Sequence, residues 1–191
     1  MTSEPTKERP IIALSSRIAY ENPWLKIRED TTLRHGGVRG IYGVVETNDS
    51  VITAAVNADN ELYIVYGYSY PTDTWSWQIP GGGGDGELPE VAAERELVEE
   101  TGITAKQFKL LGNLIVTCGL LKERMADVLA KGISLGDRPP GTDDADSVRE
   151  GKFVSFDEAA RMVVAGEICD SQTISSLYLI EKWLAGRGVS S

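Results

Sequence analysis

The sequence has little of several residue types that define whole classes of protein. Only Cys118 and Cys169 are cysteines among 191 residues, too few for the disulfide framework of a small secreted domain, so we expect reduced thiols. No apolar run approaches the roughly 20 residues that span a bilayer. The polar N-terminal segment also lacks the apolar core of a signal peptide. We therefore expect a cytoplasmic protein without a membrane partner.

Positive charge is also scarce. The chain has 19 Lys and Arg against 29 Asp and Glu, for a formal net charge of −10. Such an acidic surface repels nucleic-acid phosphates, so nucleic acid is not an expected partner. The same acidity suits a site that holds metal cations through carboxylates. Hydrophobic residues make up 41% of the chain, enough for the core of one domain with a small appended element.

Alternating apolar and polar residues, separated by turn-forming residues, predict a strand-rich chain. The expected strands cover residues 25–33, 38–45, 51–56, 62–70, 75–79, 108–117, 124–130 and 153–156. The expected helices cover residues 89–101, 157–165 and 171–185. The glycine run 81–84 is expected to lie outside regular structure, and residues 133–150 are expected to form a long polar loop. Strands and helices in this order predict an α+β fold with a mixed sheet flanked by helices.

Three glutamates share one face of the helix that follows the glycine run. Glu99 and Glu100 come three and four residues after Glu96, a spacing that brings side chains together on a helix surface. Convergent carboxylates repel one another unless cations lie between them, and hard oxygen ligands suit Mg²⁺ or Mn²⁺. Arg95 is placed to pair with Glu87 and hold the preceding loop against the helix. Taken alone, the glutamates would equally fit a solvated helix face.

The spacing of the whole segment separates these two interpretations. Residues 81–103 fit the pattern Gly-x5-Glu-x7-Arg-Glu-U-x-Glu-Glu-x-Gly-U at every position, where U is aliphatic. From average residue frequencies, a chance match in a chain of this length is on the order of 10⁻⁷ or less. The pattern is the Nudix box, so the chain resembles the Nudix hydrolase superfamily.

The resemblance implies a fold and a metal site. The expected fold is a Nudix-type α/β/α sandwich over residues 47–191, preceded by an N-terminal tail and β-hairpin extension over residues 1–46. The resemblance also implies that Glu87 and Arg95 brace the loop. The implied metal ligands are Glu96, Glu99, Glu100 and a backbone carbonyl near Gly81. One departure is that the segment from Pro80 to Glu87 is one residue shorter than is usual in the family.

The implied reaction is metal-assisted attack of water on one phosphorus of a diphosphate, with Mg²⁺ or Mn²⁺ as cofactor. A general base must accept a proton from that water. The candidates are Glu99 in the box, Glu123 after a glycine-containing loop, and Asp146 and Glu150 on the long acidic loop. In relatives that cleave ADP-ribose the base can come from a loop placed like this one, which favours it slightly. The alternative for that loop is a solvated disordered segment.

Weaker similarities outside the box point to the ADP-ribose and nucleotide-sugar pyrophosphatase group. They lie in residues 21–29 and 166–174. In that group the N-terminal hairpin often reaches across a two-fold axis, which implies a homodimer. Relatives often carry Gln and Arg where this chain has residues 67–70, so its phosphate or ribose contacts are expected to differ. The proposed substrate contacts are Trp24 and Tyr68 by stacking and Arg28 with phosphate, although strand aromatics are more often core residues.

The sequence thus leaves three functions open. The first is hydrolysis of the pyrophosphate bond of a nucleoside diphosphate linked to another moiety, such as ADP-ribose or a nucleotide sugar. The second is a nucleoside-triphosphate pyrophosphatase. The third is a non-catalytic sensor with a Nudix fold, which the intact set of box carboxylates disfavours.

Overall fold

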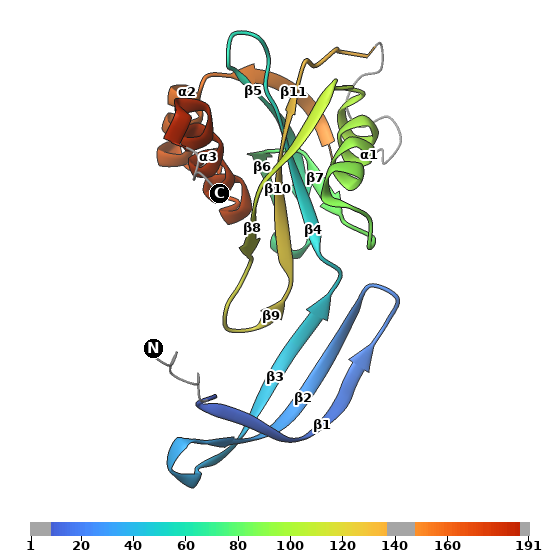
Figure 1. Ribbon diagram of the computed structural model, residues 1–191, viewed down its shortest axis with the longest axis vertical. Helices are drawn as coiled ribbons and strands as arrows, with labels where there is room; N and C mark the ends of the chain where they lie inside the picture. The colour runs from blue at the N-terminus through green and yellow to red at the C-terminus, as the bar shows by residue number, and fades with distance from the viewer. Residues whose placement is uncertain (1–8, 137–147, 188–191) are drawn as a thin grey trace, which may run out of the picture. The chain divides into compact units, whose positions relative to one another are not determined.

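A computed structural model describes residues 9–136 and 148–187 of the chain. Its contacts divide the chain into two compact units (Figure 1). The first unit comprises residues 1–48 and 117–123, and the second comprises residues 49–116 and 124–191. A division into domains after residue 46 stays a prediction.

The first unit is a four-stranded sheet in the order β1-β2-β3-β9. Its strands are β1 (Ile11–Glu21), β2 (Leu25–Arg34), β3 (Arg39–Thr47) and β9 (Leu121–Lys122). The first three strands are antiparallel neighbours. The turn between β2 and β3 contains Gly36 and Gly37, which take the positive φ angles of 82° and 80° that favour glycine. β9 extends the sheet by pairing in parallel with β3.

The second unit is an α/β/α sandwich, in which α1 covers one face of the central strands and α2 and α3 cover the other (Figure 1). Its sheets have the strand orders β7-β4-β10-β8 and β11-β5-β6. β10 is parallel to β4 and antiparallel to β8, so the predicted mixed sheet and α+β class are confirmed. The strands are β4 (Ser50–Ala55), β5 (Leu62–Ser69), β6 (Thr74–Gln78), β7 (Gly81–Gly83), β8 (Gln107–Ile115), β10 (Arg124–Lys131) and β11 (Val148–Val154).

The helices of this unit end near the predicted residues. They are α1 (Pro89–Thr101), α2 (Phe156–Ala165) and α3 (Ser171–Lys182). α1 ends at Gly102 with a φ of 69°, a left-handed conformation that suits glycine. The Ser155 and Asp170 side chains accept backbone N–H groups at the starts of α2 and α3. No helix in the described residues is long and apolar enough to cross a membrane.

Side chains of β4 alternate between two layers of core. Ile52 and Ala54 join the cluster that includes residues of α2 and α3, whereas Val51 packs with residues of α1. Burial on both faces explains why this strand reads as a continuous apolar run. The buried Thr53 hydroxyl donates a hydrogen bond to the carbonyl of Ala93 in α1 at 3.2 Å. These contacts fix α1, and with it the predicted site, on the central sheet.

Two expectations of irregular structure are wrong. Part of the glycine run forms strand β7, which pairs antiparallel with the start of β4. A Cβ on Gly81 would overlap the carbonyl oxygen of Val51, so glycine allows this close strand pairing. Strand β11 spans Val148–Val154 rather than the expected 153–156, so the last residues of the loop expected at 133–150 are regular structure. It lies at a sheet edge and has mostly polar, exposed residues at its start, so pairing with β5 rather than an apolar pattern determines its extent.

A buried carboxyl group lies in the middle of β10. Asp127 is 1% exposed. The Ser176 hydroxyl of α3 donates to its Oδ1, while its Oδ2 has no hydrogen-bond partner among the described residues. Burial raises the pKa of Asp127 to about 6, and the hydrogen bond from Ser176 opposes that shift. The folded state therefore favours the protonated carboxyl.

We expect Asp127 to make the protein less stable as the pH rises. Between the ordinary pKa near 4 and the folded value of about 6, the folded state holds the proton that the unfolded chain loses. Asp127→Asn removes this titration. From pH 5 to pH 8 the free energy of unfolding of the wild type should fall relative to the variant by about 1 kcal/mol. Urea unfolding at both pH values measures this, and a pH-independent difference would contradict a buried titrating carboxyl.

Candidate active site

The Arg95 guanidinium connects the glycine-rich loop to the carboxylates of α1. Its Nε donates to Glu87 Oε2 at 3.0 Å, and its Nη2 donates to the carbonyl of Gly83 at 2.8 Å. Its Nη1 donates to Glu96 Oε1 at 2.7 Å and to Glu99 Oε2 at 3.3 Å. The hydrogen bond to Glu96, followed by that to Glu87, raises the pKa of Arg95 above its ordinary range. One planar cation thus orients three carboxylates and a loop carbonyl.

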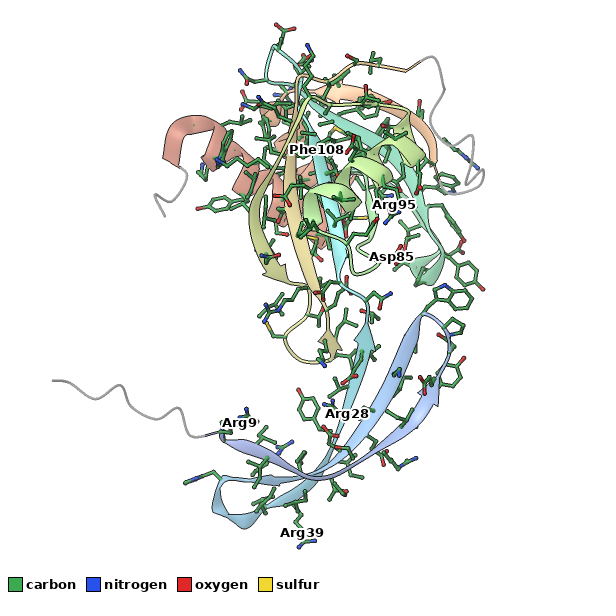
Figure 2. All side chains as sticks on the ribbon, turned by 45° about the vertical axis from the view of Figure 1, so that its right-hand side comes forward. Arg9, Arg28, Arg39, Asp85, Arg95 and Phe108 are labelled. Carbon is green, nitrogen blue, oxygen red and sulfur yellow. The ribbon has the colours of Figure 1, made fainter. Side chains whose placement is uncertain are left out.

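Asp85 adds a further carboxylate to this network (Figure 2). Its Oδ2 lies 3.4 Å from Arg95 Nη2. Asp85 and Gly86 have positive φ angles of 46° and 77°, so the loop turns sharply at this point. Sequence reasoning did not assign a role to Asp85. The Asp-Gly pair was the available signal, because Asp and Gly tolerate the left-handed conformation of tight turns.

The Glu96 carboxylate is packed against the backbone of the loop. Its side chain is 12% exposed and lies over Gly82, where a Cβ would overlap the carboxylate. Burial raises the pKa of Glu96, whereas its hydrogen bond to Arg95 lowers it. Gly82 is therefore a functional candidate that the sequence pattern did not identify.

Glu100 contacts the loop on the other side of this network. The N–H of Gly81 donates to Glu100 Oε2 at 3.0 Å. The structure thus brings together all six box residues with predicted roles, namely Gly81, Glu87, Arg95, Glu96, Glu99 and Glu100. Within residues 9–136 and 148–187, no group of three or more His, Cys, Asp or Glu side chains is arranged to hold a metal ion. Arg95 donates to both Glu96 and Glu99, and the assigned metal ligands stay predictions.

The other predicted general bases lie in different places. Glu123 belongs to the first unit, where its Oε2 accepts from the Thr47 hydroxyl at 3.3 Å. Glu150 pairs with Tyr66 of β5. The preceding residue of β5, Val65, packs in the core cluster that includes Leu97 of α1. Because paired residues share a face, Glu150 is on the face of this sheet away from α1. Asp146 lies outside the described residues.

The three residues predicted to contact the substrate lie outside the pattern at residues 81–103. Trp24 and Arg28 belong to the first unit. Trp24 is 77% exposed, whereas the Arg28 guanidinium is held by two carboxylates, Asp30 at 3.0 Å and Glu46 at 2.5 Å. Tyr68 lies on β5, and its ring contacts that of Trp75 with 5.3 Å between centroids. Its hydroxyl donates to Asp73. Substrate contacts at these positions stay predictions.

We expect Gly82→Ala and Gly81→Ala to have different effects. The three atoms nearest to a Cβ on Gly82 all belong to the end of the Glu96 side chain, so the variant should fold but displace that carboxylate, with activity falling about a hundredfold. A Cβ on Gly81 meets the backbone of Val51, so this variant should lose about 1–3 kcal/mol of stability. Thermal melting and hydrolysis assays separate the effects. Gly43→Ala, where a Cβ meets nothing within 4 Å, is the control.

If Gly82→Ala retained full activity, the placement of Glu96 over Gly82 would not matter for the reaction. If it melted as low as Gly81→Ala, the contact would support the fold rather than the chemistry.

Comparisons with known families place this geometry in context. The family model of the NUDIX domain matches residues 46–170. The nucleoside diphosphate sugar hydrolase N-terminal domain matches residues 11–45. The first match covers more than half of the chain, and its range contains the whole Arg95 network.

Individual proteins resemble the chain over most of its length. The ADP-ribose pyrophosphatase of Mycobacterium tuberculosis is 28% identical over 94% of this chain and 87% of its own length. The CMP-5'-(N-acetyl-N-hydroxy-3-aminopropyl)phosphonate hydrolase of Streptomyces rubellomurinus is 25% identical, over 86% of this chain and 79% of its own length. A crystal structure of an ADP compounds hydrolase superposes with a TM-score of 0.81 at 20% identity, covering 94% of this chain and 97% of that chain. This last likeness shows the fold.

Proposed function

The chain belongs to the Nudix family of pyrophosphohydrolases, and we propose that it hydrolyses the pyrophosphate bond of a nucleoside diphosphate joined to another group, such as ADP-ribose or a nucleotide sugar. The Arg95 network carries this proposal, because it holds the box carboxylates against the glycine-rich loop. The match of residues 11–45 to a nucleoside diphosphate sugar hydrolase domain supports the substrate class. The similarity to an ADP-ribose pyrophosphatase supports it further.

Nudix hydrolases generally need a divalent metal ion, and we propose Mg²⁺ here, with Mn²⁺ as a substitute. The chemistry of the donors supports this, because Glu96, Glu99 and Glu100 are hard oxygen ligands on one helix. Burial raises the pKa of Glu96, so a nearby cation would be favourable because it restores the charged carboxylate. When bound, such an ion neutralises phosphate oxygens and lowers the pKa of the attacking water.

The residues of the chain then divide into two roles. Arg95 and Glu87 hold the loop and orient the carboxylates. Among the candidate bases, Glu99 is the one that the described residues place beside the other carboxylates, with a side chain 54% exposed and able to reach solvent. The family resemblance favours the long acidic loop, and its candidates Asp146 and Glu150 stay predictions. A base within hydrogen-bond reach of the attacking water would take its proton as the water oxygen bonds to one phosphorus and the bridging P–O bond breaks, releasing the other phosphate group.

A substrate panel tests the proposed reaction. Phosphate-product release is measured with Mg²⁺ or Mn²⁺ for ADP-ribose, GDP-mannose, UDP-glucose, a diadenosine polyphosphate and nucleoside triphosphates. We expect a diphosphate-linked compound to be preferred and EDTA to abolish its hydrolysis. Preference for a nucleoside triphosphate would instead identify a triphosphate pyrophosphatase. Nucleotide binding without hydrolysis would identify a sensor.

Glu100→Gln tests the proposed metal site. The glutamine oxygen can still accept the N–H of Gly81, so the fold should persist while one ligand charge is lost. We expect kcat to fall about a hundredfold or more, with an unchanged melting temperature. Glu94→Gln on the exposed side of the same helix is the matched control and should behave like the wild type. Wild-type hydrolysis by Glu100→Gln would show that Glu100 is not a ligand.

We further propose that the enzyme is a homodimer in which a second copy covers the sheet of the first unit. All of β1 is exposed; its Ile18 is 50% exposed, and Ile41 of β3 is 69% exposed. In the described part of this unit no α-helix covers the sheet, and such apolar surface favours association.

Light scattering should give twice the chain mass of 20.8 kDa. Ile41→Glu should lower the measured mass toward that of one chain, whereas Val164→Glu on α2 should leave the mass unchanged. A monomeric wild type would contradict the proposal.

A further inference from the structure

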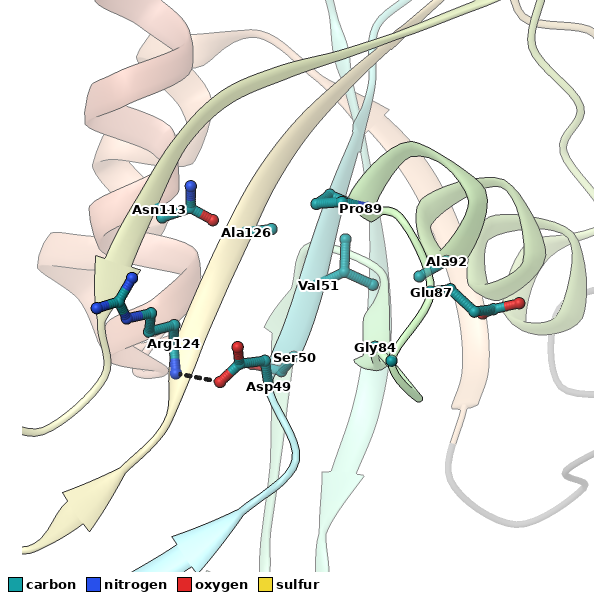
Figure 3. A pocket seen from close by; sticks show the side chains of 11 residues that line it. Asp49, Ser50, Val51, Gly84, Glu87, Pro89, Ala92, Asn113, Arg124 and Ala126 are labelled. Atoms are coloured by element: carbon teal, nitrogen blue, oxygen red, sulfur yellow. Dashed lines mark hydrogen bonds between the residues drawn. The ribbon is translucent and has the colours of Figure 1, made fainter.

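Asp49, directly before β4, lies where the sheet meets the glycine-rich loop. Its side-chain Oδ1 accepts the backbone N–H of Arg124, the first residue of β10, at 3.0 Å (Figure 3). Its backbone carbonyl accepts the N–H of Gly84 at 2.8 Å. One residue thus connects the starts of two parallel strands to the loop that carries the Arg95 network.

The glycine-rich loop borders open space at this point. A cavity of about 150 Å³ lies beside it, and Asp49, Gly84, Gly86 and Arg124 are among the residues that line it (Figure 3). Glycines contribute no side chain that could fill such a space. The position of the loop therefore depends on its hydrogen bonds. Those to the sheet are the pairing of Gly81–Gly83 with β4 and the bond from Gly84 to the Asp49 carbonyl.

The contacts continue from Asp49 to the proposed metal ligands. The N–H of Gly84 donates to the Asp49 carbonyl, and the carbonyl of the preceding residue, Gly83, accepts from Arg95 Nη2 at 2.8 Å. Arg95 in turn donates to Glu96 at 2.7 Å. A shift of Gly83 and Gly84 would therefore move the guanidinium that orients the carboxylate. Residues that orient ligands affect metal affinity without touching the metal.

We propose that Asp49 is a positioning residue, whose hydrogen bond to the N–H of Arg124 holds its own carbonyl in place for the loop and so preorganises the metal-binding carboxylates. This inference rests on the proposed metal-dependent function. The competing explanation is electrostatic, since Asp49 is also one more negative charge near a cation site. A third explanation is that its side chain is an exposed carboxylate without any effect on the loop, because Asp49 is exposed.

Two substitutions of Asp49 distinguish these explanations. Asp49→Ala removes both the acceptor and the charge, whereas Asp49→Asn removes the charge but keeps an oxygen that can accept the Arg124 N–H. If the hydrogen bond matters, Asp49→Asn should restore most of what Asp49→Ala loses. If the charge matters, the two variants should behave alike. Asp59→Ala, an exposed aspartate in the turn before β5, is the matched control.

The first measurement is hydrogen–deuterium exchange of the peptide that contains Gly84, in protein without added metal. We expect faster exchange in Asp49→Ala and near wild-type exchange in Asp49→Asn and Asp59→Ala. The second measurement is Mn²⁺ binding by calorimetry, where Asp49→Ala should bind about tenfold more weakly. With the preferred substrate, the metal concentration for half-maximal activity should rise similarly, while kcat at saturating metal should change by less than about threefold.

Unchanged exchange and unchanged Mn²⁺ affinity in Asp49→Ala would overturn the proposal, as would an Asp49→Asn variant that matches Asp49→Ala. If Asp49→Ala does not fold, Gly84→Ala tests the same contact from the loop, because its Cβ would lie 2.9 Å from the Asp49 carbonyl oxygen. Wild-type exchange and Mn²⁺ affinity in that variant would likewise overturn it. Because exchange needs neither metal nor substrate, it tests Asp49 even if the substrate panel shows no hydrolysis.

Discussion

The geometry of the site depends on the Arg95 guanidinium. It lies among Glu87, Glu96 and Glu99, whose carboxylates would otherwise repel one another, and it also holds the carbonyl of Gly83. A single exposed ion pair contributes no more than about 1 kcal/mol. The arginine adds direction, because its planar group presents donors along fixed axes. A lysine has the same charge on one compact ammonium group, so it could not hold these acceptors in the same arrangement.

This network requires a backbone that comes very close to both the sheet and the helix. Gly81 is constrained by the backbone of β4, and Gly82 is constrained by the Glu96 carboxylate. Two adjacent glycines are therefore needed for different reasons, one for strand pairing and one for the placement of a charged group. The same proximity desolvates Glu96, and this burial is the main cause of its raised pKa. Close packing thus sets the chemistry of the carboxylate as well as its position.

Sequence reasoning succeeded where the pattern was local and periodic. The helix over residues 89–101 follows from proline and glycine at its ends, and the α+β class follows from the order of the elements. The strand at Gly81–Gly83 could not be predicted, because glycine has a low strand propensity and only pairing with β4 makes it a strand. The contacts of Arg95 with Asp85 and Gly83 depend on the turn of the loop, which no spacing rule specifies.

The least predictable part of the site is its support from the sheet. Asp49 and Gly84 are 35 positions apart in the printed sequence, and their contact is between a backbone carbonyl and a backbone N–H, which every residue type except proline carries. Residue identity therefore carries no signal for it. Arg95 secures the loop from the helix by charge, whereas Asp49 secures it from the sheet by hydrogen bonds. A run of four glycines has no side chains to pack and has to be held in this way, since local opening is easiest where buried apolar contacts are few. The precision of the site thus rests on directional polar contacts on both sides of the glycines.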